Sequence, residues 1–135
     1  MRGIAPFFVR FLGNNNSGLT VNTSGGTSGS VSVTVRNSTF SGNGGVGIAA
    51  SAGASMPVGL MIRDSAIVNN ATGIVANGAT MTGRVARTVI TGNGTGLLVV
   101  GGASLLSYGN NELDGNPTVG APANGAFTGA ALPTK

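Results

Sequence analysis

The sequence contains no cysteine, no histidine and only three acidic residues among 135. Without cysteine there is neither a disulfide framework nor thiol chemistry. Without histidine, a histidine-dependent catalytic triad and a zinc site of the ordinary type are excluded. No apolar run is long enough to cross a membrane as a helix, so no membrane span is expected.

Charged side chains are also scarce, and most of them are cationic. Seven lysine and arginine residues against three acids give a net charge of +4 and an isoelectric point near 11.3. The cations are spread along the chain with no basic run and no nucleic-acid-binding motif. The high isoelectric point therefore reflects the shortage of acids, and nucleic acid is not an expected partner.

The first twelve residues suggest a signal peptide only superficially. Their apolar stretch is short, Arg10 interrupts it, and no obvious small-residue cleavage site follows. They align better with the end of a structural coil. Residues 1–13 are therefore expected to form a partial first coil or an apolar N-terminal cap.

The sequence is rich in glycine, with 25 residues, and in regularly spaced aliphatic side chains. An apolar residue recurs three positions before an asparagine, and these asparagines are 29, 27, 23 and 23 residues apart. A period of this size, filled with short β-type runs and polar turns, is typical of a solenoid of stacked coils. Asparagine tolerates left-handed backbone and can bond to its counterpart one coil away, so this column is predicted to be structural. Its members are Asn14, Asn43, Asn70, Asn93 and Asn116.

Apolar and polar residues alternate upstream of these asparagines, which predicts strands with one buried face. Three strands per coil, joined by polar turns, predict an all-β, parallel β-helix over residues 14–116, followed by a tail over residues 117–135. The predicted inward columns of the first strand are Val33, Leu60, Gly83 and Leu106, and Val35, Ile62, Val85 and Tyr108. Those of the second and third strands are Leu19, Ile48, Ile74 and Leu97, and Phe40, Ile67, Ile90 and Leu113.

Two turn motifs and a recurring Gly-x-aliphatic strand carry a family resemblance. The motifs are Asn37-Ser38-Thr39-Phe40 and Asp64-Ser65-Ala66-Ile67. Over residues 11–116 the pattern resembles the right-handed parallel β-helix repeat proteins of the pectate-lyase-like superfamily, and most of all its small uncharacterised bacterial members. The resemblance implies a right-handed solenoid of about four full coils plus a partial first coil, in an extracellular or cell-surface location.

Arginines form a second column on the predicted surface. Arg36 and Arg63 occupy the same coil position, Arg87 lies one place further along the turn, and Arg84 lies nearby on the outward face. Stacked guanidinium groups suit an acidic polysaccharide or another polyanion. The alternative is a solvated turn in which Asp64 and Asn37 relieve the repulsion, because exposed charges often contribute little.

Catalysis has few candidate residues, namely Asp64, Glu112 and Asp114. Glycosidases of the superfamily use two or three clustered carboxylates, and pectate-lyase chemistry uses a calcium cluster. The leading expectation is therefore a non-catalytic, self-associating structural or surface-binding module without a cofactor. The alternative is a minimal carbohydrate-active or ester- or lactone-cleaving hydrolase, with weakly bound calcium near Asp64 and Asn37.

Two apolar surfaces point to self-association. One is an outward strip that ends in Val75, Leu98 and Val100, and the other is the aromatic N-terminal end with Phe7 and Phe8. A homo-oligomer is expected, with a dimer favoured because two-fold assemblies are commonest. Two alternatives stay open: the tail covers the strip, or the chain is the C-terminal piece of a longer β-helix.

Overall fold

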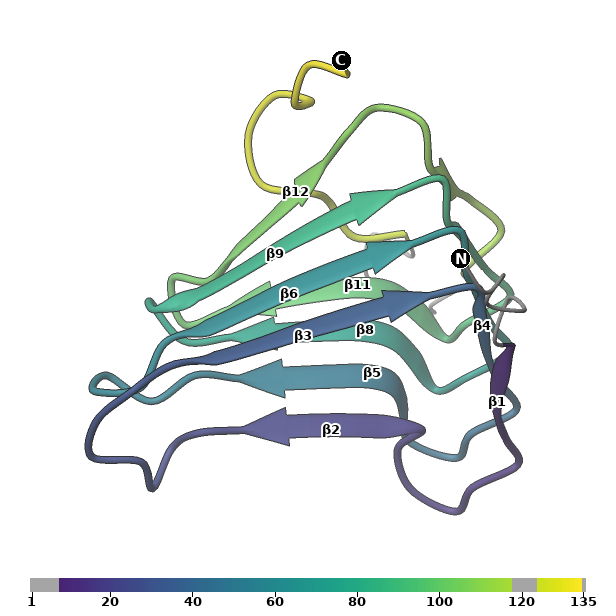
Figure 1. Cartoon of the computed structure of the whole chain (residues 1–135). Coiled ribbons are helices and arrows are strands. Elements are labelled where there is room, and N and C mark those ends of the chain that lie inside the picture. The colour runs from purple at the N-terminus through teal and green to yellow at the C-terminus, as the bar shows by residue number, and fades with distance from the viewer. Residues whose placement is uncertain (1–7, 118–123, 135) are drawn as a thin grey trace, which may run out of the picture.

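The computed structural model describes residues 8–117 and 124–134 (Figure 1). Within this part of the chain there are thirteen β-strands and no helix, and the strands form three parallel sheets. The chain passes through the sheets in turn and winds into a β-solenoid of about four turns. The predicted parallel β-helix is thereby confirmed.

Each sheet takes one strand from each successive coil, so its strands are stacked in chain order. Sheet A comprises β1 (Val9–Leu12), β4 (Ser38–Ser41), β7 (Ala66–Val68), β10 (Val89–Thr91) and β13 (Glu112–Leu113). Sheet B comprises β2 (Leu19–Asn22), β5 (Val46–Ser51), β8 (Thr72–Asn77) and β11 (Thr95–Val100). Sheet C comprises β3 (Val31–Arg36), β6 (Val58–Arg63), β9 (Met81–Ala86) and β12 (Ser104–Ser107).

The core is a set of aliphatic columns that run along the solenoid axis. Strand pairing places like residues directly above one another, as in the sheet B column of Ile48, Ile74 and Leu97. Because parallel strands lie about 4.8 Å apart, such side chains pack against each other from coil to coil. The predicted inward columns of sheets A and B are confirmed, as are those of sheet C through β9. Their fully buried members include Phe40, Ile62, Ile67, Val85 and Ile90.

The prediction for the fourth strand of sheet C is wrong by one residue. Leu105, rather than Leu106, pairs with Gly83, and Leu105 is fully buried while Leu106 and Tyr108 are partly exposed. A Cβ atom on Gly83 would lie 2.6 Å from a methyl carbon of Leu105, so the leucine fills the space that the glycine leaves. A one-residue shift exchanges the inward and outward faces of a strand.

The Gly-x-aliphatic motif has a steric cause at the start of each sheet B strand. A Cβ atom on Gly47 would lie 2.7 Å from the carbonyl oxygen of Gly73, and the same position in the next coil meets the carbonyl oxygen of Gly96. Real Cβ atoms essentially never approach a backbone oxygen this closely. Glycine therefore allows successive coils to stack at the spacing of a parallel sheet.

The asparagine column is a continuous hydrogen-bonded ladder, as predicted. The Asn70 backbone N–H and side-chain amide both donate to Oδ1 of Asn93, each over 3.0 Å. The Asn93 amide in turn donates to Oδ1 of Asn116 and to the carbonyl oxygen of Ile67. Every rung repeats this direction, and the Asn116 side-chain amide donates in the same way to Oδ1 of Asn124 in the tail. Because Asn43, Asn70, Asn93 and Asn116 are buried, the ladder satisfies polar groups that would otherwise lie unpaired inside the turns.

The tail closes the C-terminal end of the solenoid. Asn124 accepts a hydrogen bond from the Leu97 backbone of sheet B, and Thr128 exchanges hydrogen bonds with Leu105 of sheet C. Between these two anchors Phe127 packs against the core. The yellow segment in Figure 1 thus crosses from one sheet to another rather than continuing around the coil. The described tail residues plug the end of the core.

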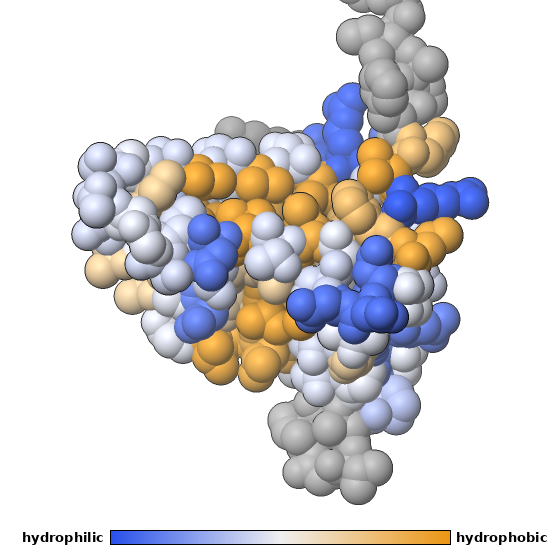
Figure 2. Space-filling view, turned by 90° about the horizontal axis from the view of Figure 1, so that it is seen from below, coloured by the Kyte–Doolittle hydropathy of each residue, from blue (hydrophilic) through white to orange (hydrophobic). Residues whose placement is uncertain are grey.

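The N-terminal end has a different structure. There β1, β2 and β3 each form the outer edge of their sheet, with no further strand beyond them in residues 8–117 and 124–134. Figure 2 shows this end with apolar surface at its centre and polar groups around it. Leu19 and Val33 are only half-buried here, although Ile48 and Leu60, their neighbours in the next coil, are buried.

Candidate functional site

The turns that lead from sheet C to sheet A position the candidate charged residues. The middle residue of each turn has a left-handed backbone, with φ of 50° at Asn37, 52° at Asp64 and 44° at Arg87. The next residue is a serine or threonine whose hydroxyl donates to the carbonyl oxygen two residues earlier. Asn37, Asp64 and Arg87 consequently lie at the same corner of successive coils.

Asp64 is held between two arginines at this corner. Its Oδ1 accepts from Nε of Arg87 over 2.6 Å, and its Oδ2 accepts from Nη2 of Arg87 over 3.0 Å and from Nε of Arg63 over 3.1 Å. Hydrogen bonds from Arg87 and then from Arg63 outweigh partial desolvation and lower the pKa of the Asp64 carboxyl to about 2. The bond to Asp64 also raises the pKa of Arg87. This corner is therefore a fixed, fully ionised cluster at neutral pH.

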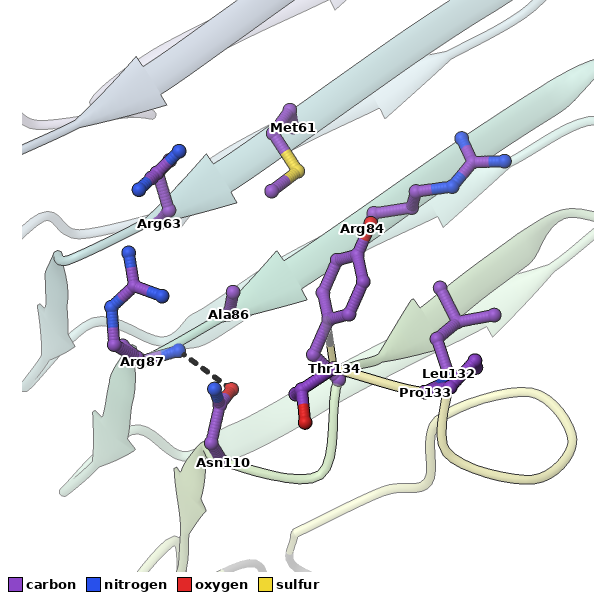
Figure 3. Close-up of a pocket in the computed structure, with 10 residues that line it drawn as sticks. Met61, Arg63, Arg84, Ala86, Arg87, Asn110, Leu132, Pro133 and Thr134 are labelled. Atoms are coloured by element: carbon purple, nitrogen blue, oxygen red, sulfur yellow. Dashed lines mark hydrogen bonds between the residues drawn. The ribbon is translucent and has the colours of Figure 1, made fainter.

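An open groove lies beside this corner on the outer face of sheet C (Figure 3). Its volume is about 600 Å³, and its walls come from β6, β9, the segment after β12 and the tail. Figure 3 shows Arg63 and Arg87 on neighbouring coils, and a hydrogen bond from the Arg87 backbone N–H to Asn110. The lining residues are Met61, Arg63, Arg84, Ala86, Arg87, Tyr108, Asn110, Leu132, Pro133 and Thr134.

The four predicted arginines divide into two pairs. Arg63 and Arg87 are neutralised in part by Asp64, whereas Arg36 and Arg84 form no ion pair within the described residues. Arg36 pairs with Arg63 across β3 and β6, as predicted, but it lines a second hollow at the N-terminal end. Three guanidinium groups thus line the groove, and the Asp64 carboxylate beside it contacts two of them.

The other acidic candidates lie apart from this groove. Glu112 belongs to β13 of sheet A and Asp114 follows that strand, and both are exposed. Asp114 accepts a hydrogen bond from the backbone N–H of Gly115. In the described part of the chain, no group of three acidic, histidine or cysteine residues is arranged to hold a metal ion. Glu112 and Asp114 therefore do not form a cluster with Asp64.

The predicted interface residues lie in two separate places. Val75, Leu98 and Val100 follow the outer face of sheet B, where Leu98 is 44% and Val100 40% exposed. Phe8 lies at the N-terminal end and is 73% exposed. Phe7 falls outside the described residues. The described tail packs on the end of the core, and the exposed fractions show that it does not cover the sheet B strip completely.

Sequence reasoning missed the residues that give the groove its shape. Tyr108 was predicted to point inward, no role was assigned to Asn110, and Leu132 was considered as part of a tail covering the sheet B strip, whereas it lines the groove on sheet C. Tyr108 is the only tyrosine of the chain, and Gly109 follows it with a φ of 77°. This tyrosine–glycine break in an otherwise aliphatic column was the available signal that β12 had ended.

Comparison with protein-family models, with curated proteins and with solved structures gives no match. No helix of the described residues has the length and apolar character to cross a membrane. The candidate site is therefore interpreted from its own geometry.

Proposed function

We propose that this protein is a non-catalytic binding module for an acidic polysaccharide, which it holds in the groove on sheet C. The observation that carries the proposal is Arg84, an exposed guanidinium without an acidic partner among the described residues, in a groove shared with Tyr108 and Arg87. Guanidinium groups pair with carboxylates through two parallel hydrogen bonds. Tyrosine adds a flat, largely apolar surface with a polar tip.

The shape of the groove favours a chain over a compact ligand. It is open to solvent and lies across strands that repeat at about 4.8 Å, so it offers successive contacts along an extended molecule. Most small-molecule sites enclose their ligand instead. A polymer with a carboxylate on successive sugar units offers one anionic group to Arg84 and others to Arg63 and Arg87, which lie on two neighbouring coils of the same groove.

The state of Asp64 supports binding over hydrolysis. A general acid must be protonated near the working pH, but the pKa of Asp64 is about 2 and two arginines already occupy its oxygens. Glu112 and Asp114 belong to another sheet and line neither this groove nor the hollow at the N-terminal end. The calcium-dependent hydrolase remains the second candidate only through the presence of these three acids.

The experiment is calorimetric titration with a short oligouronate, compared with a neutral oligosaccharide of equal length. Arg84→Ser should weaken binding about three- to tenfold, because one charge-assisted contact is lost at an exposed site. Arg10→Ser removes the same charge from sheet A, outside the groove, and should leave the affinity of the monomeric protein for the short oligouronate unchanged. Asp64→Asn should strengthen binding, since it frees Arg63 and Arg87, and Asn37 shows that asparagine fits this left-handed position.

Two results would contradict the proposal. Equal affinities of the Arg84→Ser and Arg10→Ser variants would remove the groove from consideration. Equal binding of the neutral oligosaccharide would show that charge has no part in recognition. Cleavage of the oligouronate that disappears in the Asp64→Asn variant would instead establish the hydrolase alternative.

A further inference from the structure

The open N-terminal end is an apolar feature that the proposed function leaves unused. Phe8, Val9 and Leu12 are 73%, 45% and 53% exposed there, and a hollow of about 320 Å³ leads to the stacked rings of Phe11 and Phe40. Figure 2 shows the apolar centre of this end. Within residues 8–117 and 124–134, β1, β2 and β3 each leave one strand edge unpaired at this end, and soluble proteins rarely leave such a surface and such edges without a partner.

Among the described residues, the charged side chains at the two ends of the solenoid are of opposite sign. The described first turn, residues 8–37, carries Arg10 and Arg36 and no acid, whereas Glu112 and Asp114 lie in the last turn, which has no cation in residues 104–117 or 124–134. Two N-terminal ends facing each other would bring arginine against arginine. An N-terminal end facing a C-terminal end brings opposite charges together.

Strand register makes this complementarity specific to one column. Arg10 is aligned with Thr39, Ala66 and Val89 of successive coils, and the same column ends at Glu112. No other strand lies beyond β1 at one end of sheet A or beyond β13 at the other, within the described residues. If β1 of one copy continued the sheet at β13 of another, Arg10 would follow Glu112 in register at the spacing of adjacent strands, about 4.8 Å.

The asparagine ladder also has a direction that only one arrangement preserves. Every rung donates toward the C-terminal end, from Asn14 through to Asn124. In a head-to-tail stack this direction repeats from copy to copy, and in a head-to-head pair it reverses at the interface. The tail offers a matching apolar surface, because Ala126, Ala130 and Ala131 are exposed at the C-terminal end.

We propose that copies of this chain associate head to tail, with the open N-terminal end of one copy on the C-terminal end of the next and with Arg10 paired to Glu112. The contact is heterologous, because it joins two different surfaces of the chain. Every assembly therefore keeps a free surface at each end and grows by addition of further copies. The stack also places the sheet C grooves of successive copies along one side. Repeated binding sites on one side strengthen the retention of a long polymer.

The test is light scattering over a range of protein concentrations at low salt. The wild type should increase in mass with concentration beyond two chains. Arg10→Glu and Glu112→Arg should each raise the dissociation constant about tenfold or more, because each puts like charges side by side. The double variant Arg10→Glu/Glu112→Arg should recover the wild-type mass, as should a mixture of the two single variants.

Matched controls separate this pairing from general charge effects and from misfolding. Asp114→Arg makes the same charge change as Glu112→Arg at a position outside the Arg10 column, so its effect should be smaller. Circular dichroism and thermal unfolding should show each variant folded, since Arg10 and Glu112 are both exposed. A wild type that stays monomeric, or a closed dimer that Glu112→Arg does not affect, would overturn the proposal.

Discussion

The two ends of this solenoid differ in how the core of the outermost coil is covered. At the C-terminal end Leu97 and Leu105 are 3% and 0% exposed, because the tail crosses the end and Phe127 packs against the core. At the N-terminal end Leu19 and Val33 remain half-buried, and Phe8 is largely exposed. In a stacked repeat, only an interior coil has both of its faces covered by neighbouring coils. Each end therefore needs a cap that the repeat itself does not supply.

This contrast distinguishes the effect of an inward-facing side chain from the effect of its position along the solenoid axis. Leu19 and Ile74 belong to one column of sheet B and both point inward, but in the described part of the chain only Ile74 has a strand on each side. Substitutions at these equivalent positions therefore measure how much the contribution of an inward side chain to protein stability depends on the neighbouring coils.

The largest difference is expected between Ile74→Asn and Leu19→Asn. Ile74 is fully buried, so an unpaired amide at this position should destabilise the protein by about 2–5 kcal/mol. At protein concentrations low enough to keep the chain monomeric, the amide at Leu19 reaches solvent at the open end, and the loss should be less than half as large. Midpoints of chemical denaturation measure both. Equal losses would show that the N-terminal end is covered even in the monomer.

A smaller difference is expected along the asparagine ladder. Asn93→Ala removes the acceptor of the Asn70 N–H and side-chain amide and the donor to Ile67, which should cost about 3 kcal/mol. Asn14→Ala removes one exposed rung and should cost less than about 1 kcal/mol. Thermal unfolding of the two variants measures the contrast. An Asn14→Ala variant as unstable as Asn93→Ala would contradict an exposed first rung.

The plug itself is tested by Phe127→Ala against Phe8→Ala. Phe127 is half-buried against the core, so its loss should destabilise the protein by about 2 kcal/mol. It should also speed amide hydrogen exchange in β11 and β12, which the tail covers. Phe8→Ala should leave the stability of the monomer almost unchanged. Unchanged exchange in both strands would show that the tail does not hold the end closed.

The smallest effect concerns Asp64, which lies midway between the two ends. Its pKa falls from an ordinary value of 3.8 to about 2, so the ion pairs stabilise the fold above about pH 4. This stabilisation is lost as the pH falls through about 2, where the carboxylate becomes protonated. Wild type and Asp64→Asn should therefore differ slightly in melting temperature at pH 7 and coincide near pH 2. A difference that persists below pH 2 would exclude the ion pairs as its cause.

The sequence alone determined the interior of the solenoid. Apolar residues at every second position and asparagines at a nearly constant period specify coils, because a parallel strand presents like side chains at like positions. The columns through Ile48, Ile62, Phe40 and Asn70 follow directly from this rule, and so does the pairing of Arg36 with Arg63. Each depends only on nearest neighbours along the axis.

Only the tertiary structure decided where this rule fails. Alternation has the same period in both registers, so the sequence could not show that Leu105 rather than Leu106 fills the space over Gly83. Nor did it place Phe127 over the core or Tyr108 in the groove, since both follow breaks in the repeat. Strand pattern specifies the faces of a coil, whereas the closure of an end and the walls of a groove depend on contacts between segments that share no period.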